Sequence, residues 1–261
     1  MNKSRLGEML TYRRPAFSRT EREFVSRYID TIPGIRADKF GNRMLIHPDS
    51  RTIIACHTDT VHTCAGRQKL NNANGIISLH ANEKLSTCLG ADDTAGIYAC
   101  LRMIESKVPV TFIFHRQEEI GGRGSQWLAD HHEKWLTGFD RCISLDRRGT
   151  QDIIESHMYG TCCSREFISG LADALDMGHG PADGSFTDSA NYMHLIPECS
   201  KISVGYANEH RAIESLDTEY LEELIVRLCT VDWENLPVMR DPRDLDVWWF
   251  EEENSNFPIA K

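Results

Sequence analysis

Two patterns of apolar residues alternate along this chain, and together they predict its secondary structure. Short apolar runs bounded by polar turns, such as residues 110–114, are typical of buried strands. Between them lie longer segments in which apolar residues recur every three or four positions, the spacing that places them on one face of a helix. Alternation of strands and helices of these lengths predicts an α/β fold with a largely parallel sheet.

The predicted elements follow from these patterns and from the residues that bound them. The first substantial helix is expected over residues 18–31, because Ser18 and Thr20 are each followed three positions later by a glutamate, the arrangement of a capping box. Further helices are expected at residues 90–106, 125–135, 162–176 and 218–231, and strands at 43–47, 52–56, 110–114, 142–145, 153–154 and 202–204. The first two strands flank a Pro-Asp-Ser turn and are expected to pair as a hairpin. Residues 61–87 are expected to form a loop or hairpin excursion near the site, and residues 180–189 a loop.

Composition and charge narrow the class of protein. At 261 residues, with 41% apolar and 26% charged residues, the chain can bury a substantial core. Because it contains no internal repeat, low-complexity tract or linker, residues 1–261 are expected to form a single domain. The net charge of -10 argues against a nucleic-acid partner. A membrane partner is not expected either, because no apolar run reaches the roughly 18 residues of a spanning helix.

The cysteines indicate the compartment in which the protein works. There are nine, an odd number without a Cys-x-x-Cys pair, and the first residues lack the apolar segment of a secretory signal. These features predict free thiols in a reducing environment, and therefore a cytoplasmic protein.

The C-terminal segment is rich in aromatic residues. Trp233, Trp248, Trp249 and Phe250 lie there among acidic residues. We expect these side chains to pack against the body of the domain, with an interface to another chain as the alternative.

The first pair of candidate functional residues to consider lies just after the apolar run 110–114. Two adjacent carboxylates, Glu118 and Glu119, follow this run and precede Gly121 and Gly122. Successive residues of an extended chain point in opposite directions, so the two carboxylates are expected to take different roles. One can bind a cation while the other faces a water molecule or a substrate, although a solvated acidic turn is the commoner case for such a pair alone.

Two further motifs lie at the boundaries of predicted elements. His57 and Asp59 follow the strand at 52–56 and share one side of the chain, which suits a metal-bound imidazole oriented by a carboxylate. A surface histidine beside an acid is the commoner case for this motif alone. Asp92 and Asp93 open the next helix, where one aspartate can serve as a cap. Two adjacent carboxylates repel each other unless a cation lies between them, so this pair also indicates a metal.

Together these motifs predict a metal site. Asp146 ends another strand and His210 lies in a late loop, and strand ends in an α/β sheet converge along one edge. Histidine combined with carboxylates favours Zn²⁺, and the same donors accept Co²⁺ or Mn²⁺. With one carboxylate shared, the set fits two metal ions about 3.5–4 Å apart.

The motifs resemble those of the co-catalytic zinc exopeptidases, the superfamily of Aeromonas-type leucyl aminopeptidases, peptidase T and carboxypeptidase G. The matching stretches, in family order, are His57–Val61, Gly90–Gly96, Gln117–Gly122, Leu145–Asp146 and Gly205–His210. The resemblance covers the core from residue 50 to residue 215. It implies a three-layer fold, with a central mixed, largely parallel sheet flanked by helices.

The resemblance also implies a role for each matching residue. The ligands of two zinc ions would be His57 and Asp146 at one ion, Glu119 and His210 at the other, and Asp92 between them. Asp59 would orient His57, and Glu118 would act as general base on the attacking water. Asp93 matches a position that in the family often follows a cis peptide bond.

The chain departs from peptidase T and carboxypeptidase G in one respect. Those proteins insert a lid or dimerisation domain between the fourth and fifth motifs, whereas Asp146 and His210 lie too close in this sequence to leave room for it. The expected architecture is therefore one catalytic domain over residues 1–261. The loop at 184–189 resembles one near the substrate terminus in relatives, where Asp188 would either meet a substrate amine or cap a turn.

The predicted function is that of a cytoplasmic di-zinc exopeptidase, an aminopeptidase acting on short peptides. The enzymic alternative is a related zinc amidohydrolase, an N-acyl amino acid deacylase or a carboxypeptidase. Arg147 and Arg148 would then bind the carboxylate of the substrate, unless both are simply solvated. A catalytically inactive binding protein fits less well, because suitable residues fill all five ligand positions and the position of the base.

Overall fold

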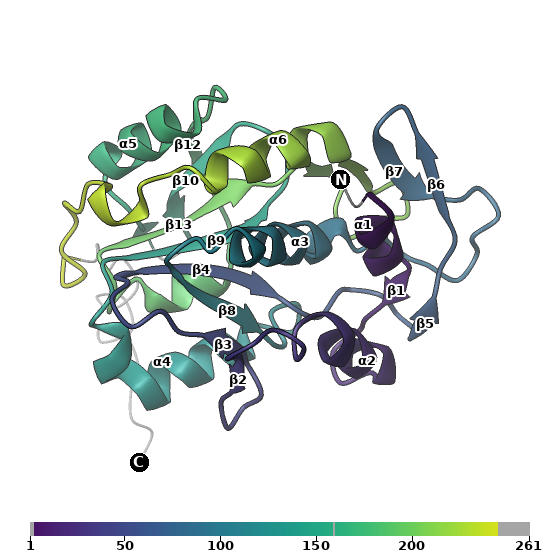
Figure 1. The fold of residues 1–261 in the computed structure, drawn as a ribbon, viewed down its shortest axis with the longest axis horizontal. Helices are drawn as coiled ribbons and strands as arrows, with labels where there is room; N and C mark the ends of the chain where they lie inside the picture. The colour runs from purple at the N-terminus through teal and green to yellow at the C-terminus, as the bar shows by residue number, and fades with distance from the viewer. Residues whose placement is uncertain (1–2, 159, 245–261) are drawn as a thin grey trace, which may run out of the picture.

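Helices cover both faces of one large sheet in the computed structural model, which describes residues 3–158 and 160–244 (Figure 1). The strands of this sheet are β2 (Arg36–Ala37), β3 (Arg43–Leu45), β4 (Thr52–His57), β8 (Thr111–His115), β9 (Arg141–Arg147), β10 (Asp152–His157), β11 (Gly160–Thr161), β12 (Gly180–Asp183) and β13 (Glu198–Ser203). Over the described residues their order is β11-β10-β13-β9-β4-β8-β3-β2, with β12 beside β10.

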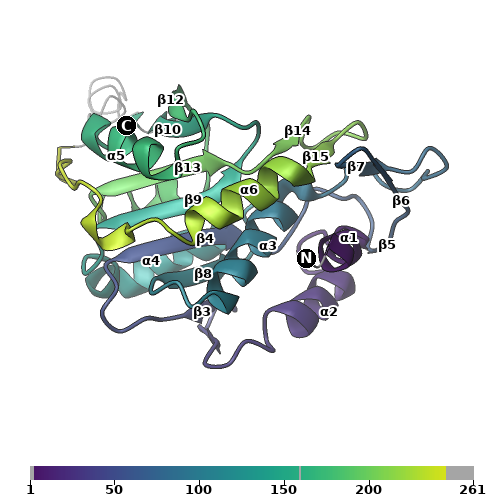
Figure 2. The ribbon, with the colours of Figure 1, turned by 45° about the horizontal axis from the view of Figure 1, so that its top comes forward.

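The helices form the outer two of three layers. They are α1 (Lys3–Leu10), α2 (Arg19–Tyr28), α3 (Ala91–Glu105), α4 (Arg123–Leu136), α5 (Arg165–Leu175) and α6 (Thr218–Leu228), with the short 3-10 helices η1 (Asp188–Tyr192) and η2 (Trp233–Asn235). α3, α5 and α6 lie on one face of the sheet, while η1 and α4 lie on the other, as Figures 1 and 2 show.

The centre of the sheet is parallel, and its margins are antiparallel. β13, β9, β4 and β8 run in the same direction, whereas β10 and β3 join them antiparallel on either side. The predicted α/β fold with a mixed, largely parallel sheet is therefore confirmed. Because parallel strands end at the same edge, the carboxyl ends of β4, β8 and β9 meet there.

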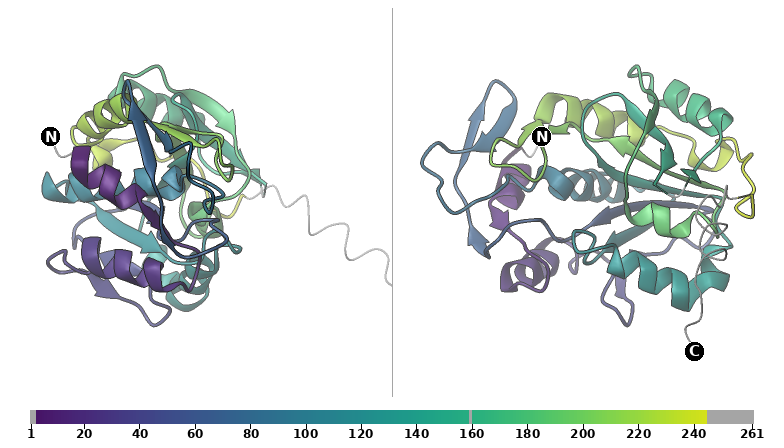
Figure 3. Two further views of the ribbon diagram at one scale, coloured as in Figure 1. Left: turned by 90° about the vertical axis from the view of Figure 1, so that its right-hand side faces the viewer. Right: turned by 180° about the vertical axis from the view of Figure 1, so that it is seen from behind.

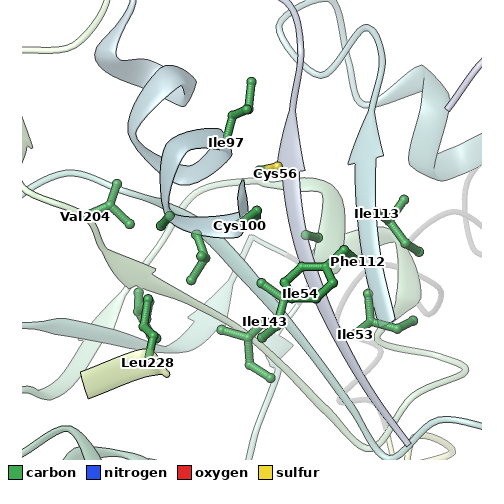
Figure 4. Close-up of a cluster of buried hydrophobic side chains, with 14 of the residues drawn as sticks. Ile53, Ile54, Cys56, Ile97, Cys100, Phe112, Ile113, Ile143, Val204 and Leu228 are labelled. Carbon is green, nitrogen blue, oxygen red and sulfur yellow. The ribbon is translucent and has the colours of Figure 1, made fainter. Parts of the chain in front are cut away.

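The central strands are buried on both faces, which explains their continuous apolar sequences. Every residue of β4 is buried, and Ile53 and Ile54 are fully enclosed. Figure 4 shows Ile54 and Cys56 on the side of β4 that faces Cys100 of α3, the helix that packs on β4 and β9, and Ile53 on the other side of the strand. Complete burial of one such aliphatic side chain contributes about 1.5–3 kcal/mol. This core holds in place the strand ends that carry the polar motifs.

The predicted hairpin between residues 43–47 and 52–56 is wrong. β3 and β4 do not pair with each other, because β8 lies between them, antiparallel to β3 and parallel to β4. All residues of β4 are buried, whereas those of β3 are only partly buried. The more apolar strand therefore takes the central position, and its burial on both faces outweighs the closeness of the two strands in sequence.

Regions predicted as loops contain further short strands. β12 and the start of η1 lie within residues 180–189, so the prediction of an irregular loop there is wrong in part. Residues 61–87 form the excursion that was expected, with strands β5 (Gly66–Arg67), β6 (Leu70–Ala73) and β7 (Ile76–Leu79), and β5 pairs with β1 (Tyr12–Arg13). Asn74 and Gly75 connect β6 to β7 with φ values of 53° and 80°, as a type I′ hairpin turn requires.

A second sheet places this hairpin beside the late loop of the chain. Its order is β14-β15-β7-β6, where β14 is Tyr206–Ala207 and β15 is Ser215–Asp217. This sheet forms the end of the molecule opposite α5 (Figures 1 and 3). Leu216 of β15 lies opposite Ile77 of β7, and both side chains are buried. The loop with His210 connects β14 to β15 and is therefore held at both ends.

Side-chain caps begin three of the helices. Ser18, Ser164 and Asp217 accept hydrogen bonds from backbone N–H groups in the first turns of α2, α5 and α6. Such a cap satisfies donors that have no partner within the helix, and contributes about 0.5–2 kcal/mol. The cap at Ser18 confirms the predicted start of the first amphipathic helix, although the shorter α1 precedes it.

The aromatic residues of the C-terminal segment are described only in part. Trp233 is buried, and its indole N–H donates to the backbone oxygen of Leu228 at 3.2 Å, so this residue packs on the domain as expected. Trp248, Trp249 and Phe250 lie outside the described residues. Within residues 3–158 and 160–244, no helix combines the length and apolar character needed to cross a bilayer.

Candidate functional site

Six polar side chains meet where the central parallel strands end. They are His57 from the end of β4, Asp92 from the start of α3, Glu118 and Glu119 from the turn after β8, Asp146 from the end of β9, and His210 from the β14–β15 loop. A pocket of about 510 Å³ opens over them, and all except the buried His57 line it. The structure thus brings together the five residues predicted as ligands and the residue predicted as general base.

The first group of potential metal ligands surrounds the imidazole of His57. Its Nε2 lies 3.0 Å from Asp92 Oδ1 and 3.6 Å from Asp146 Oδ1. The ligand atoms of these three buried residues lie within 4.8 Å of one another, close enough to share one ion. Asp146 is held in place by the hydroxyl groups of Thr187 and Tyr206, which donate to its two carboxylate oxygens at 2.8 and 3.1 Å.

The second group surrounds the imidazole of His210. Its Nε2 lies 3.2 Å from Asp92 Oδ2 and 3.1 Å from Glu119 Oε2, and these three residues could also hold a metal ion. Asp92 therefore offers one carboxylate oxygen to each group. This sharing is the arrangement that a bridging ligand between two cations requires.

Asp92 and Asp93 are adjacent but take different partners. A cis peptide bond joins them, and the buried Asp93 carboxylate accepts hydrogen bonds from the backbone N–H groups of His57 and Gly96, at 3.1 and 2.9 Å. A Cβ atom at position 96 would lie 2.0 Å from the backbone oxygen of Leu145. Glycine there allows the start of α3 to approach β9 closely enough to bring Asp92 to the site.

A buried arginine, for which the sequence contains no signal, lies beneath these carboxylates. Arg14 is 0% exposed, and it donates to the backbone oxygen of Thr58 and to the hydroxyl of Thr94, both at 2.9 Å. Burial lowers the pKa of Arg14 to about 10, and the negative charges of Asp93 and Asp59 oppose that shift. Arg14 therefore offsets part of the negative charge that accumulates below the pocket.

Asp59 lies close both to His57 and to the turn that carries Glu118 and Glu119. Its carboxylate lies 3.8 Å from His57 Nδ1, while its own backbone oxygen is closer to that nitrogen, at 3.2 Å. The same carboxylate accepts hydrogen bonds from the backbone N–H groups of Glu118 and Glu119, at 3.1 and 3.3 Å. The orientation of His57 by Asp59 stays a prediction, and the contact with the glutamate pair is an additional one.

The two glutamates diverge because the chain turns, and the strand alternation expected from the sequence does not apply to them. β8 ends at His115, and Gln117 has a φ of 64°, so Glu118 and Glu119 lie in a tight turn. Glu119 contacts His210 through Oε2, whereas its Oε1 is buried without a hydrogen-bond partner among the described residues. No described residue donates a hydrogen bond to the Glu118 carboxylate, which lines the pocket.

The electrostatics of the cluster are those of carboxylates crowded together at low exposure to water. Burial and the nearby charge of Asp146 raise the pKa of Glu118 well above its usual range, against the opposing effect of His57. Burial and the charge of Asp92 raise the pKa of Glu119 to about 7. Hydrogen bonds to Asp92 and Glu119 raise the pKa of His210 to about 11.

These shifts mean that the protein alone retains protons among the carboxylates, because like charges at short distance cannot all ionise. A divalent cation supplies the positive charge that those protons otherwise supply. The buried Oε1 of Glu119 provides an oxygen for which no described residue is a donor. The donor set of imidazole and carboxylate groups and its charge therefore fit a divalent metal.

Glu214 is a further residue of the site, because its carboxylate organises the segment that carries Asp92. It is 0% exposed and accepts hydrogen bonds from the backbone N–H groups of Leu89, Gly90 and Asp92, at 2.8, 3.0 and 3.1 Å. Burial and the charge of Asp92 raise the pKa of Glu214 to about 7. A single glutamate in a polar loop has no signature in the sequence, so only the folded chain reveals this role.

We expect Glu214→Gln to weaken metal binding about 10–100-fold, the usual effect of losing a group that orients a ligand. The amide oxygen can still accept one hydrogen bond, but the NH₂ group faces backbone donors, so the segment before Asp92 must shift. Competition with a chromophoric zinc chelator measures the change. Glu219→Gln, an exposed acid on α6, is the matched control. Equal metal affinity in both variants would contradict a role for Glu214 in placing Asp92.

The two residues predicted to bind substrate have different surroundings. Asp188 is 2% exposed, accepts a hydrogen bond from the Ser125 hydroxyl at 2.6 Å and lies 3.2 Å from His115 Nδ1. It does not line the pocket, so this geometry gives no support to contact between Asp188 and a substrate amine. Arg147 does line the pocket, and its Nη2 lies 2.8 Å from a carboxylate oxygen of Asp152.

Comparison with known proteins gives matches at the level of structure. No protein-family model matches the sequence, and a search of curated proteins gives no match. Aminopeptidase PepT from Bacillus cereus superposes with a TM-score of 0.71 at 13% identity, over 88% of this chain and 97% of that one. A tripeptidase from Staphylococcus aureus has a TM-score of 0.68 at 14% identity, with coverages of 88% and 97%. An aminopeptidase from the archaeon Desulfurococcus kamchatkensis has a TM-score of 0.66 at 12% identity, covering 98% of both chains.

The chain therefore has the fold of these aminopeptidases over most of its length. This agrees with the resemblance to peptidase T that the motifs suggest. At such identities the likeness establishes the fold alone, and the chemistry depends on the residues that this chain places at its own site.

Proposed function

We propose that this protein is a di-zinc exopeptidase that removes the amino-terminal residue of short peptides. The observation that carries this proposal is the position of Asp92, which offers one oxygen to the His57 group and the other to the His210 group. The fold shared with aminopeptidases is compatible with this function, but one fold can serve many reactions, so the proposal rests on the residues of the site. We further propose that residues 1–261 belong to one catalytic domain, without an inserted lid or dimerisation domain.

In the proposed reaction, His57, Asp92 and Asp146 would hold one ion, and Asp92, Glu119 and His210 would hold the other. Bound divalent ions would supply acidification of a water molecule and polarisation of the scissile carbonyl group. Glu118 accepts the proton of the attacking water and returns it to the leaving amine, because its carboxylate is unengaged and faces the pocket. Asp59 fixes the turn that carries this base through its hydrogen bonds to the glutamate pair.

The chemical groups at the two ends of the substrate test this proposal. We expect a dipeptide with a free amine to be hydrolysed, and its N-acetylated form to be cleaved at least about 10²-fold more slowly, because a site built for a polar group rejects an analogue that lacks it. Acetylation removes the positive charge of the substrate's amino group, which the carboxylates that line the pocket attract. A C-terminal amide should still be cut. Product analysis by mass spectrometry, with added Zn²⁺, measures all three rates.

The opposite pattern, in which N-acylated substrates are cut and free amines are not, would establish a deacylase or carboxypeptidase instead. The cationic side chains of Arg147 and Arg148 on the pocket wall make this the second candidate function. A zinc-loaded protein that cleaves no member of the panel would favour the inactive binding protein.

A further inference from the structure

Acidic and cationic side chains line the same pocket. Besides the carboxylates of the candidate metal site and those of Asp183 and Glu209, the lining includes three cationic side chains, Arg147, Arg148 and Lys201. The segment Gly184–Phe186 also lines the pocket. A substrate bound at the candidate metal site therefore shares its pocket with these cations.

Two of these three cations already have acidic partners within the chain. Arg147 lies 2.8 Å from the carboxylate of Asp152, and Arg148 Nη1 lies 2.8 Å from Glu209 Oε1. Each arginine is thus largely neutralised before any ligand arrives. The remaining cation, Lys201, is different.

Lys201 is a buried ammonium group without an acidic partner. The residue is 6% exposed, and in residues 3–158 and 160–244 no carboxylate lies within 4.0 Å of its Nζ. Its ammonium group donates a hydrogen bond to the backbone oxygen of Phe186 at 2.7 Å. An ammonium group has three donors, and burying a charge without a counter-charge is costly. An anionic group bound in the pocket would remove that cost.

The position of Lys201 in the sheet directs it toward the site. Lys201 lies in β13 opposite Ser144 of the parallel strand β9, and Asp146 is two residues beyond Ser144. The register of the two strands shifts beyond this pair, so alternation alone does not place Asp146. One segment connects the two residues: Phe186 accepts a hydrogen bond from Lys201, and the adjacent Thr187 donates one to Asp146. The candidate metal ligand Asp146 and the unpaired cation Lys201 are therefore close together on adjacent strands.

His157 is a buried neighbour of these cations. It is 4% exposed, and neither ring nitrogen has a hydrogen-bond partner among the described residues. Burial, and then the positive charges of Lys201 and Arg147, lower the pKa of His157 to about 3. His157 therefore supplies no counter-charge to Lys201.

We propose that Lys201 binds a carboxylate group on the leaving part of the substrate, and that the substrates are di- and tripeptides recognised by this group. The inference rests on the proposed function for the bond that is cut, but the carboxylate site itself requires only binding. A pocket of about 510 Å³ has the size of a site for a compact ligand, which agrees with a short peptide. The carboxylate can be the peptide's C-terminus or an acidic side chain next to the scissile bond.

Binding of uncleavable analogues tests the inference directly. The probes are leucyl-glycine analogues whose peptide bond is reduced to a methylene-amine, one with a free C-terminal carboxylate and one with a carboxamide. We expect the zinc-supplemented wild-type protein to bind the carboxylate form about 10–100-fold more tightly by calorimetry, the usual value of a charged hydrogen bond. Lys201→Met should bring this ratio close to one, and Lys201→Arg should retain most of it. Lys134→Met, which removes an exposed lysine from α4, should behave as wild type.

A second pair of reduced analogues identifies the source of the carboxylate. If leucyl-glutamate amide binds more tightly than leucyl-glutamine amide, and Lys201→Met removes the difference, the acidic side chain is the group bound. If only the terminal carboxylate shows the Lys201-dependent preference, the C-terminus is the group bound.

The fold of Lys201→Met gives a further check. Without ligand, its melting temperature should equal or exceed that of wild type, because the variant removes an unpaired buried charge. A wild-type preference for carboxylate that persists in Lys201→Met, or no preference in any pair, overturns the inference. Binding as expected without hydrolysis of the parent dipeptides contradicts the proposed function but not the carboxylate site. Hydrolysis without a Lys201-dependent preference contradicts the carboxylate site alone.

Discussion

Glu118→Gln is expected to lower kcat by about 10²–10⁴-fold, the usual contribution of a positioned general base, with little change in KM. Glutamine keeps the shape of the side chain but cannot accept the proton of the attacking water. Because Glu118 belongs to neither group of potential ligands, we expect the variant to retain its full metal content. Its fold should also persist, since no described residue donates a hydrogen bond to the carboxylate that is replaced.

The neighbouring variant Glu119→Gln is expected to behave differently. Glu119 Oε2 lies 3.1 Å from His210 Nε2 within the second group of ligands, so a neutral side chain weakens that site. Metal content should fall toward one ion per chain, and excess zinc should restore part of the rate. Substitution of these two adjacent acids is thus expected to have different effects: Glu118→Gln lowers kcat, and Glu119→Gln lowers the metal content.

Steady-state kinetics and elemental analysis on the same preparations distinguish these two outcomes. Glu133→Gln, an exposed acid on α4, is the control for loss of one negative charge and should match wild type in both measurements. If Glu118→Gln loses metal while Glu119→Gln keeps it, the two roles are reversed and this part of the mechanism is wrong.

Removal of metal is the second change with a large expected effect. Dialysis against a chelator should abolish peptidase activity, and readdition of Zn²⁺ should restore it. Before dialysis, elemental analysis should give a zinc content near two per chain, because two groups of ligands share Asp92. A metal-free preparation with full activity would end the di-zinc proposal.

The melting temperature should fall on chelation for two physical reasons. Ligand binding stabilises the native state by mass action, by about 4 kcal/mol when the free ion exceeds its Kd a thousandfold. Without cations, the carboxylates of Asp92, Glu119 and Asp146 also repel one another at low exposure to solvent. In Glu119→Gln the fall should be smaller, since one site is already weakened. Differential scanning calorimetry with and without zinc measures both shifts.

Much of the fold could be predicted from the sequence because the central strands are continuous apolar runs. Residues 52–56, 110–114 and 142–145 each become a buried strand of the parallel centre. The helices α4, α5 and α6 show clear amphipathic spacing, whereas α3 is buried along most of its length. The pairing of β3 could not be predicted in the same way, because it depends on competition between strands for the central positions.

In the candidate site, too, the residues next to apolar runs could be predicted from the sequence, whereas residues brought in from distant parts of the chain could not. His57, Asp92 and Asp146 directly follow apolar runs or open a helix, so their meeting at one edge follows from the topology of a parallel sheet. Glu214 and Lys201 have no such marker. Glu214 acts on backbone groups more than a hundred positions away in sequence, and Lys201 differs from the other described lysines by its burial. Both properties arise only after folding.

The pairing of β7 with β15 limits how far this protein can be minimised by engineering. The β6–β7 hairpin extends from one end of the molecule, and its turn is exposed, so it looks like a segment that can be deleted (Figure 3). Yet Ile77 covers Leu216, and the backbone N–H of Thr218 donates to the oxygen of Gly75 at 2.9 Å. A chain trimmed of this hairpin would leave β15 paired with β14 alone and loosen the loop that carries His210. The trimmed protein would keep the ligands around His57 and become a one-metal scaffold, whose second position is open to redesign.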